Sequence, residues 1–169
     1  RQVVASLIDQ VDRIYIYLNQ YDEVPSFLKH PRITVKTGGE DLRDNGKFYY
    51  VPEIPSGYVF TVDDDIVYPP DYVQSLIRKI ELYGRKAVVG LHGTIFANPL
   101  VTYFADRTLL HFKHPLERDR IVDQLGTGTV AFHTSLWRPA HTEFASTGMV
   151  DAWLAVGAAR RGISMIAVG

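Results

Sequence analysis

Residues 58–73 read Tyr58-Val59-Phe60-Thr61-Val62-Asp63-Asp64-Asp65-Ile66-Val67-Tyr68-Pro69-Pro70-Asp71-Tyr72-Val73. The first five are aromatic or β-branched and carry no charge, which predicts a buried strand. Three carboxylates follow, and then a loop with two prolines and the start of an amphipathic helix. Because like charges repel at a partly buried strand end, the pattern predicts a positive group beside them, most simply a divalent cation.

Length and composition favour one soluble-type domain over residues 1–169. The net charge of −1 argues against a nucleic-acid partner, which requires a clustered excess of Lys and Arg. No apolar run is long enough for a transmembrane helix. The chain has no cysteine, which suits a reducing cytoplasm. It begins at Arg1 on a predicted helix, so we expect a fragment of a longer chain that lacks a strand before Arg1 and a segment after Gly169.

Apolar spacing predicts an alternation of helices and short, strongly apolar strands. The predicted helices span 2–10, 71–83 and 149–161, and the main predicted strands span 13–18, 32–36, 58–62, 87–91 and 163–168. Shorter strands are predicted at 108–112 and 120–125. This alternation is typical of an α/β fold with a mostly parallel sheet and helices on both faces. Such sheets bind ligands beyond the carboxyl ends of their strands, so we expect polar loops to converge there on one crevice.

The acidic triplet and the polar loop 41–47 supply the first candidates. If the strand continued, Asp63 and Asp65 would face one side and could bracket a cation; the alternative is an acidic turn before the next helix. In the loop, Lys47 could offset the charge of a diphosphate, and Asp44 could accept a hydrogen bond from a base or ribose. The alternative for this loop is an ordinary solvated surface.

Two later segments add candidates. Asp151 stands at the start of a predicted helix, where an acid already complements the helix dipole without any other role. Gly126 and Gly128 lie close together and could bring backbone N–H groups near a ligand; the alternative is a tight turn between strands.

Residues 60–72 resemble the DXD region of glycosyltransferases with the GT-A fold, in particular family-2-like bacterial enzymes. The resemblance implies a GT-A version of the parallel sheet, a nucleotide-sugar donor such as a UDP-sugar, a glycan or glycolipid acceptor, and Mn²⁺ or Mg²⁺. It also implies that Asp65 binds the metal, that Asp63 faces the ribose or sugar of the donor, and that Asp64 assists at the donor sugar.

The same resemblance gives roles to the other candidates. Asp151, with Trp153 and Leu154, is similar to the segment that carries the catalytic base of inverting enzymes, although Val150 stands where that pattern often has a second acid. By the resemblance, the 44–47 loop lies on the nucleotide side and the two glycines line the donor-sugar and acceptor pocket. The implied location is the cytoplasm, with peripheral association at the inner face of the membrane.

Two alternatives compete with this interpretation. A haloacid-dehalogenase-type phosphohydrolase also has a strand followed by Asp-x-Asp, but in that family this strand comes first, whereas here two predicted strands precede it. A non-catalytic module that binds nucleotide-sugars would have the same donor residues without the base.

Overall fold

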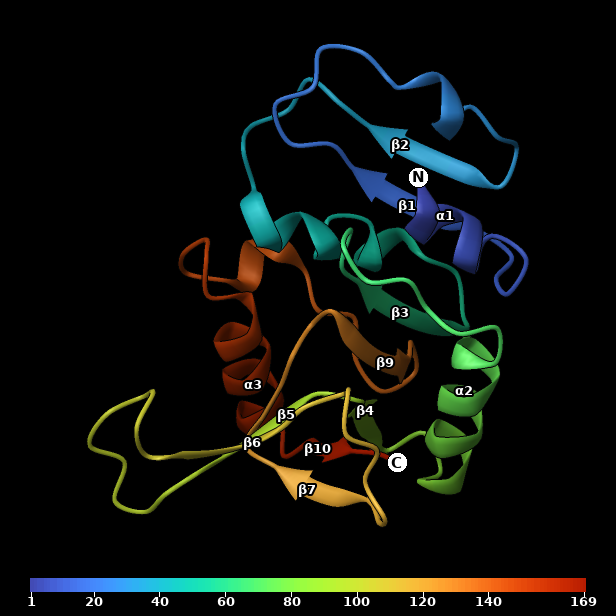
Figure 1. The fold of residues 1–169 in the computed structure, drawn as a ribbon. Coiled ribbons are helices and arrows are strands. Elements are labelled where there is room, and N and C mark those ends of the chain that lie inside the picture. Colours follow the sequence, from blue (N-terminus) through green and yellow to red (C-terminus); the bar gives the residue numbers. More distant parts are fainter.

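The computed structural model describes residues 1–169 as three β-sheets, three α-helices and four short 3₁₀ helices (Figure 1). The helices are α1 (Gln2–Leu7), α2 (Tyr72–Leu82), α3 (Val150–Arg160), η1 (Ser26–Leu28), η2 (Arg43–Phe48), η3 (Val51–Glu53) and η4 (His141–Glu143). The strands are β1 (Ile14–Tyr17), β2 (Ile33–Lys36), β3 (Tyr58–Val62), β4 (Ala87–Gly90), β5 (Gly93–Phe96), β6 (Arg107–Leu110), β7 (Arg120–Val122), β8 (Gln124–Leu125), β9 (Thr129–His133) and β10 (Ser164–Ala167).

The largest sheet has five strands in the order β3-β9-β4-β10-β7. A two-stranded sheet, β1-β2, and a three-stranded sheet, β6-β5-β8, lie outside it. Only two of the seven strand pairings, β1 with β2 and β4 with β10, are parallel.

The predicted α/β fold with a mostly parallel sheet, of the GT-A type, is therefore wrong. The prediction took continuous apolar runs as a sign of parallel strands, but such runs indicate only burial on both faces. All five residues of β9 are buried, yet β9 runs antiparallel to both of its neighbours. After β4, the chain continues without a helix into the antiparallel pairings of β5 with β6 and β8, although β4 and β10 themselves are parallel.

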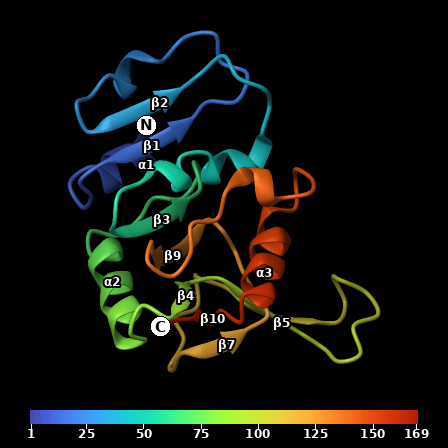
Figure 2. The ribbon, with the colours of Figure 1, turned by 180° about the vertical axis from the view of Figure 1, so that it is seen from behind.

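The five-stranded sheet is buried because α2 and α3 lie on opposite faces of it (Figures 1 and 2). On β4, Val88 packs in the same cluster as Leu154 of α3, whereas the next residue, Val89, packs in the cluster that contains Leu76 and Ile80 of α2. Neighbouring residues of a strand point to opposite faces, so one Val-Val pair serves both layers.

Most predicted elements are present with shorter bounds. The strand over 58–62 is confirmed as β3, and the helices predicted at 71–83 and 149–161 are confirmed as α2 and α3. The expected strand at 120–125 is split into β7 and β8. Strand β5 was not predicted, and most of the polar loop 41–47 lies in the 3₁₀ helix η2.

The pairing of β3 with β9 determines where the acidic triplet lies. Val62, the last residue of β3, lies opposite Thr129, the first residue of β9. The residue after β3 therefore lies beside the turn that precedes β9, which holds the two candidate glycines. Separately, none of the helices has the length and apolar character needed to cross a membrane.

Candidate functional site

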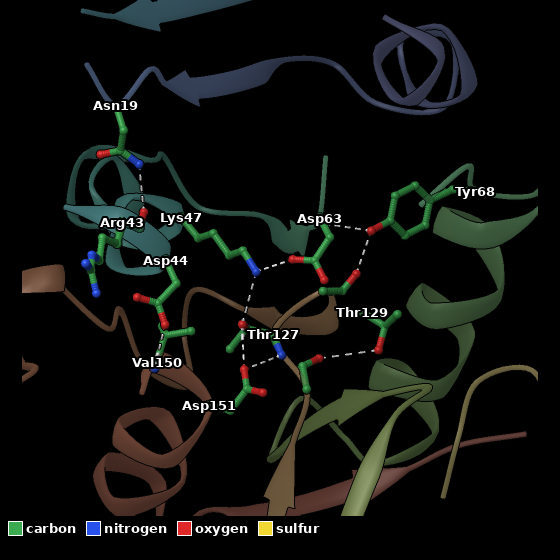
Figure 3. Close-up of polar contacts among 12 residues, drawn as sticks. Asn19, Arg43, Asp44, Lys47, Asp63, Tyr68, Thr127, Thr129, Val150 and Asp151 are labelled. Atoms are coloured by element: carbon green, nitrogen blue, oxygen red, sulfur yellow. Dashed lines mark hydrogen bonds and ion pairs between the residues drawn. The ribbon is translucent and has the colours of Figure 1, made fainter. Parts of the chain in front are cut away.

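A cavity of about 360 Å³ lies where four polar segments meet (Figure 3). They are η2, the end of β3, the turn between β8 and β9, and the start of α3. Its polar lining includes Asp44, Lys47, Asp63, Thr127, Asp151 and His92, together with Gly126 and Gly128. The structure thus brings together six of the eight candidate residues from four regions that are far apart in the sequence.

Lys47 joins two sides of the cavity. Its Nζ forms an ion pair with Asp63 Oδ1 and lies 3.3 Å from Thr127 Oγ1 (Figure 3). The Lys47 side chain is 22% exposed and that of Asp63 is 35% exposed, so the pair is only partly in water. The positive group that the clustered acids required is therefore supplied by the chain itself, at Asp63.

Asp151 is held through one carboxylate oxygen. Its Oδ1 accepts hydrogen bonds from the Thr127 backbone N–H at 2.8 Å and from the Thr127 hydroxyl at 2.7 Å. No hydrogen bond reaches its Oδ2. Thr127 is 1% exposed and cannot easily move away, so it fixes the orientation of the carboxylate and leaves the second oxygen available to a ligand. A continuous chain of polar contacts therefore runs from Asp63, at the end of β3, through Lys47 and Thr127 to Asp151 of α3.

Asp44 lies in the cavity wall, but both of its oxygens have backbone partners. Oδ1 accepts from the Gly148 N–H at 2.6 Å, and Oδ2 accepts from the Val150 N–H at 3.0 Å. Val150 is the first residue of α3, where N–H groups lack partners within the helix, and Gly148 lies just before the helix. Asp44 therefore caps the helix that carries Asp151, a role that sequence reasoning did not assign to it.

The two glycines allow close approach between segments. A Cβ at Gly128 would collide with the Asp63 carboxylate, and a Cβ at Gly126 would come within 2.9 Å of the His92 ring. The Gly126 N–H also donates to the His92 carbonyl oxygen at 2.9 Å. Both glycines thus shape the cavity by letting its walls meet closely.

Tyr68 is a site residue that the sequence analysis missed. Its hydroxyl accepts from the Asp63 N–H at 2.8 Å and donates to the Gly128 carbonyl oxygen at 2.6 Å. The residue is 3% exposed, and burial raises the pKa of its phenol well above its usual value. Tyr68 thus fastens the end of β3 to the glycine turn, and the only sequence signal for it was its place in the 58–73 stretch.

An aromatic wall was also missed. His92, Tyr103 and Phe112 line the cavity together with the polar residues. Burial, and next the neighbouring His111, lower the pKa of His92, which keeps its ring neutral at neutral pH. Its Nδ1 is buried without a hydrogen-bond partner. These three residues lie within or just outside the hairpin formed by β5 and β6, and no pattern in the sequence pointed from them to the site.

Asp64 and Asp65 do not line the cavity. Strand β3 ends at Val62, and Asp64 and Asp65 form an exposed turn, so the strand alternation expected for the triplet does not apply. No three His, Asp or Glu side chains lie close enough together to hold a metal ion. Mg²⁺ and similar hard cations are often bound by one or two carboxylates plus substrate phosphates.

Comparison with known proteins adds no assignment. No protein-family model matches the chain, and no curated protein matches its sequence.

Proposed function

We propose that the protein is a glycosyltransferase that moves a sugar from a nucleotide-sugar, most simply a UDP-sugar, to a hydroxyl of a glycan or glycolipid with inversion. The observation that carries this proposal is the pairing of Asp151 and Lys47 through Thr127 in one cavity. One carboxylate with a free oxygen and one cation in the same cavity match the needs of a proton acceptor and a leaving diphosphate.

The Asp151 carboxylate acts as the general base. Its Oδ2 accepts the proton of the acceptor hydroxyl as the hydroxyl oxygen forms a bond to the anomeric carbon. The bond between that carbon and the diphosphate oxygen breaks, and its electron pair leaves with the nucleoside diphosphate. Because Thr127 holds Oδ1 with two hydrogen bonds, the free oxygen points in a fixed direction and little orientation is lost on binding.

Lys47 serves the donor side. A diphosphate in the cavity would compete with Asp63 for its ammonium group, and the released Asp63 carboxylate could then accept hydrogen bonds from the donor ribose or sugar. A divalent cation bound by Asp65 would stabilise charge on the leaving diphosphate, and Asp64 would assist at the donor sugar. Mn²⁺ and Mg²⁺ are the cations we expect.

The aromatic wall gives a place for the acceptor. His92, Tyr103 and Phe112 face the same cavity as Asp151, and ring faces suit the apolar faces of sugars. A glycolipid acceptor would bring the protein to the inner face of the membrane from the cytoplasm.

The proposal is tested by the Asp151→Asn variant in a UDP-sugar hydrolysis and transfer assay. Asparagine keeps one oxygen for the two Thr127 donors but replaces the base oxygen with NH₂. We expect turnover to fall by about 10²–10⁴-fold while UDP binding is unchanged. The matched control, Asp22→Asn, changes an exposed carboxylate and should leave turnover unchanged. Unchanged turnover in Asp151→Asn would contradict the assignment of the base.

The two alternatives make different predictions. A phosphohydrolase needs an Asp63 oxygen free to attack phosphorus, but Lys47 binds Oδ1 and the carboxylate packs against Gly128, so the contacts do not favour it. A non-catalytic module would bind UDP with no turnover in the natural protein. Hydrolysis of a phosphomonoester that depends on Asp63 would favour the phosphohydrolase.

A further inference from the structure

The loop between β5 and β6, residues 97–106, projects away from the body of the protein in both views (Figures 1 and 2). It exposes large apolar side chains: Leu100 is 49% exposed, Val101 79% and Phe104 77%. Scattered exposed apolar residues are ordinary, but three within five positions of one projecting loop mark an interaction surface.

The loop has an internal framework that holds these side chains outward. The Asp106 Oδ2 accepts three hydrogen bonds, from the Val101 N–H at 3.1 Å, the Thr102 N–H at 2.7 Å and the Thr102 hydroxyl at 3.1 Å. The Ala97 N–H donates to the Asp106 carbonyl oxygen at 2.8 Å, which closes the base of the loop. The apolar tip is therefore presented by a built turn.

Next to the tip residues Leu100, Val101 and Phe104 lies a collar formed by the Tyr103 ring and the Arg107 guanidinium. The Arg107 guanidinium stands 5.2 Å from the centre of the Tyr103 ring and 4.8 Å from that of Phe104. The Tyr103 hydroxyl accepts a hydrogen bond from Gln124 Nε2 at 2.9 Å and so ties the collar to the body. An apolar end above amphipathic aromatic and cationic side chains is the pattern found at membrane–water interfaces.

We propose that the tip of this loop inserts into the surface of a lipid bilayer. The shape favours lipid over a protein partner, because a protein would need a pocket to receive a projecting tip, whereas acyl chains accept it directly. The only acid of the loop, Asp106, accepts hydrogen bonds from the Val101 and Thr102 N–H groups of the same loop. The positive charge of Arg107 suits lipid phosphates.

The position of the collar links the loop to the cavity. Tyr103 belongs both to the collar and to the cavity lining. Insertion of the tip would therefore place the aromatic wall of the cavity next to the membrane surface, within reach of an acceptor carried on a lipid. This link rests on the proposed function, whereas lipid binding by the loop does not depend on it.

The test is co-sedimentation of the protein with vesicles of phosphatidylcholine alone and of phosphatidylcholine with phosphatidylglycerol. The test variant is Val101→Ser with Phe104→Ser, and the matched control is Leu82→Ser, which alters an apolar side chain that is 70% exposed on α2. We expect the natural protein to bind both vesicles, more tightly with the anionic lipid. The double variant should bind on the order of tenfold or more weakly, since each side chain loses burial in the bilayer.

Three results would overturn the proposal: no binding of the natural protein to either vesicle, equal binding by the double variant, or an equal loss in Leu82→Ser. If vesicles are not bound and the double substitution changes the oligomeric state in size-exclusion chromatography, the tip is a contact between copies of the chain. UDP binding, measured without vesicles on the same preparations, separates failure of this proposal from failure of the proposed function.

Discussion

Asp44→Ala tests the finding that this residue supports the start of α3. The substitution removes two hydrogen bonds to the Gly148 and Val150 N–H groups. It also removes a negative charge at a helix N-terminus. We take about 1 kcal/mol for each hydrogen bond, because the site is partly in water, and about 0.3–1 kcal/mol for the charge. The free energy of unfolding should therefore fall by about 2–3 kcal/mol.

For a domain of this size, that loss corresponds to a decrease of about 5–10 °C in the melting temperature. Asp44→Asn should cost less, about 1 kcal/mol, because one oxygen remains while NH₂ faces the second N–H group. The assay is thermal unfolding followed by circular dichroism, with Glu40→Ala as the control for an exposed carboxylate in the same region. Unchanged melting temperatures together with lost UDP binding would refute the capping role and favour the nucleotide role.

Three further changes test the contacts of the cavity and the two buried histidines. Thr127→Val should lower turnover by about tenfold with little change in UDP binding, because Asp151 loses one of its two hydrogen bonds. Thr127→Ser keeps the hydroxyl and should retain the turnover of the natural protein. Equal turnover in the two variants would contradict the orienting role of Thr127. Gly128→Ala should destabilise the protein by about 1–3 kcal/mol in denaturant unfolding through collision with Asp63, whereas Gly57→Ala, where a Cβ meets nothing, should cost less. Burial lowers the pKa of His92 and His133 in the folded protein below the ordinary value of 6.5. As the pH drops below 6.5, these histidines therefore take up protons in the unfolded chain before they do so in the folded protein, and the free energy of unfolding should fall. His92→Gln combined with His133→Gln should flatten this fall in a pH series of melting temperatures, and the exposed His114→Gln should not.

Local patterns predicted the elements better than their arrangement. Residues 58–62 form the expected strand because aromatic and β-branched residues fit a buried, extended chain. The direction of the strands could not be read in this way, since β9 is buried at every position, as a central parallel strand would be, yet runs antiparallel. Direction depends on which distant segments pair, and a single sequence carries no periodic signal for that.

At the candidate site too, the sequence predicted single residues better than their spatial arrangement. Asp63 stood out because clustered charges at the end of an apolar strand require an explanation, Lys47 because a cation could offset a diphosphate, and Asp151 through the family resemblance. The structure places all three in one cavity. Asp44 also stood out, but its partners are backbone N–H groups more than 100 positions away, which no local pattern could indicate. His92 and Tyr103 lie in an irregular segment, so only the folded chain brings them to the cavity.

The account depends most on the claim that the cavity binds a nucleoside diphosphate through Lys47. Isothermal titration calorimetry with UDP, with and without Mn²⁺, tests it on the natural protein and on Lys47→Met, which keeps an unbranched side chain one atom shorter and loses the charge. The account predicts UDP binding that is tighter with Mn²⁺ and at least about tenfold weaker in Lys47→Met, in line with the loss of a charge-assisted contact. No binding by the natural protein, or equal binding by Lys47→Met, would contradict it.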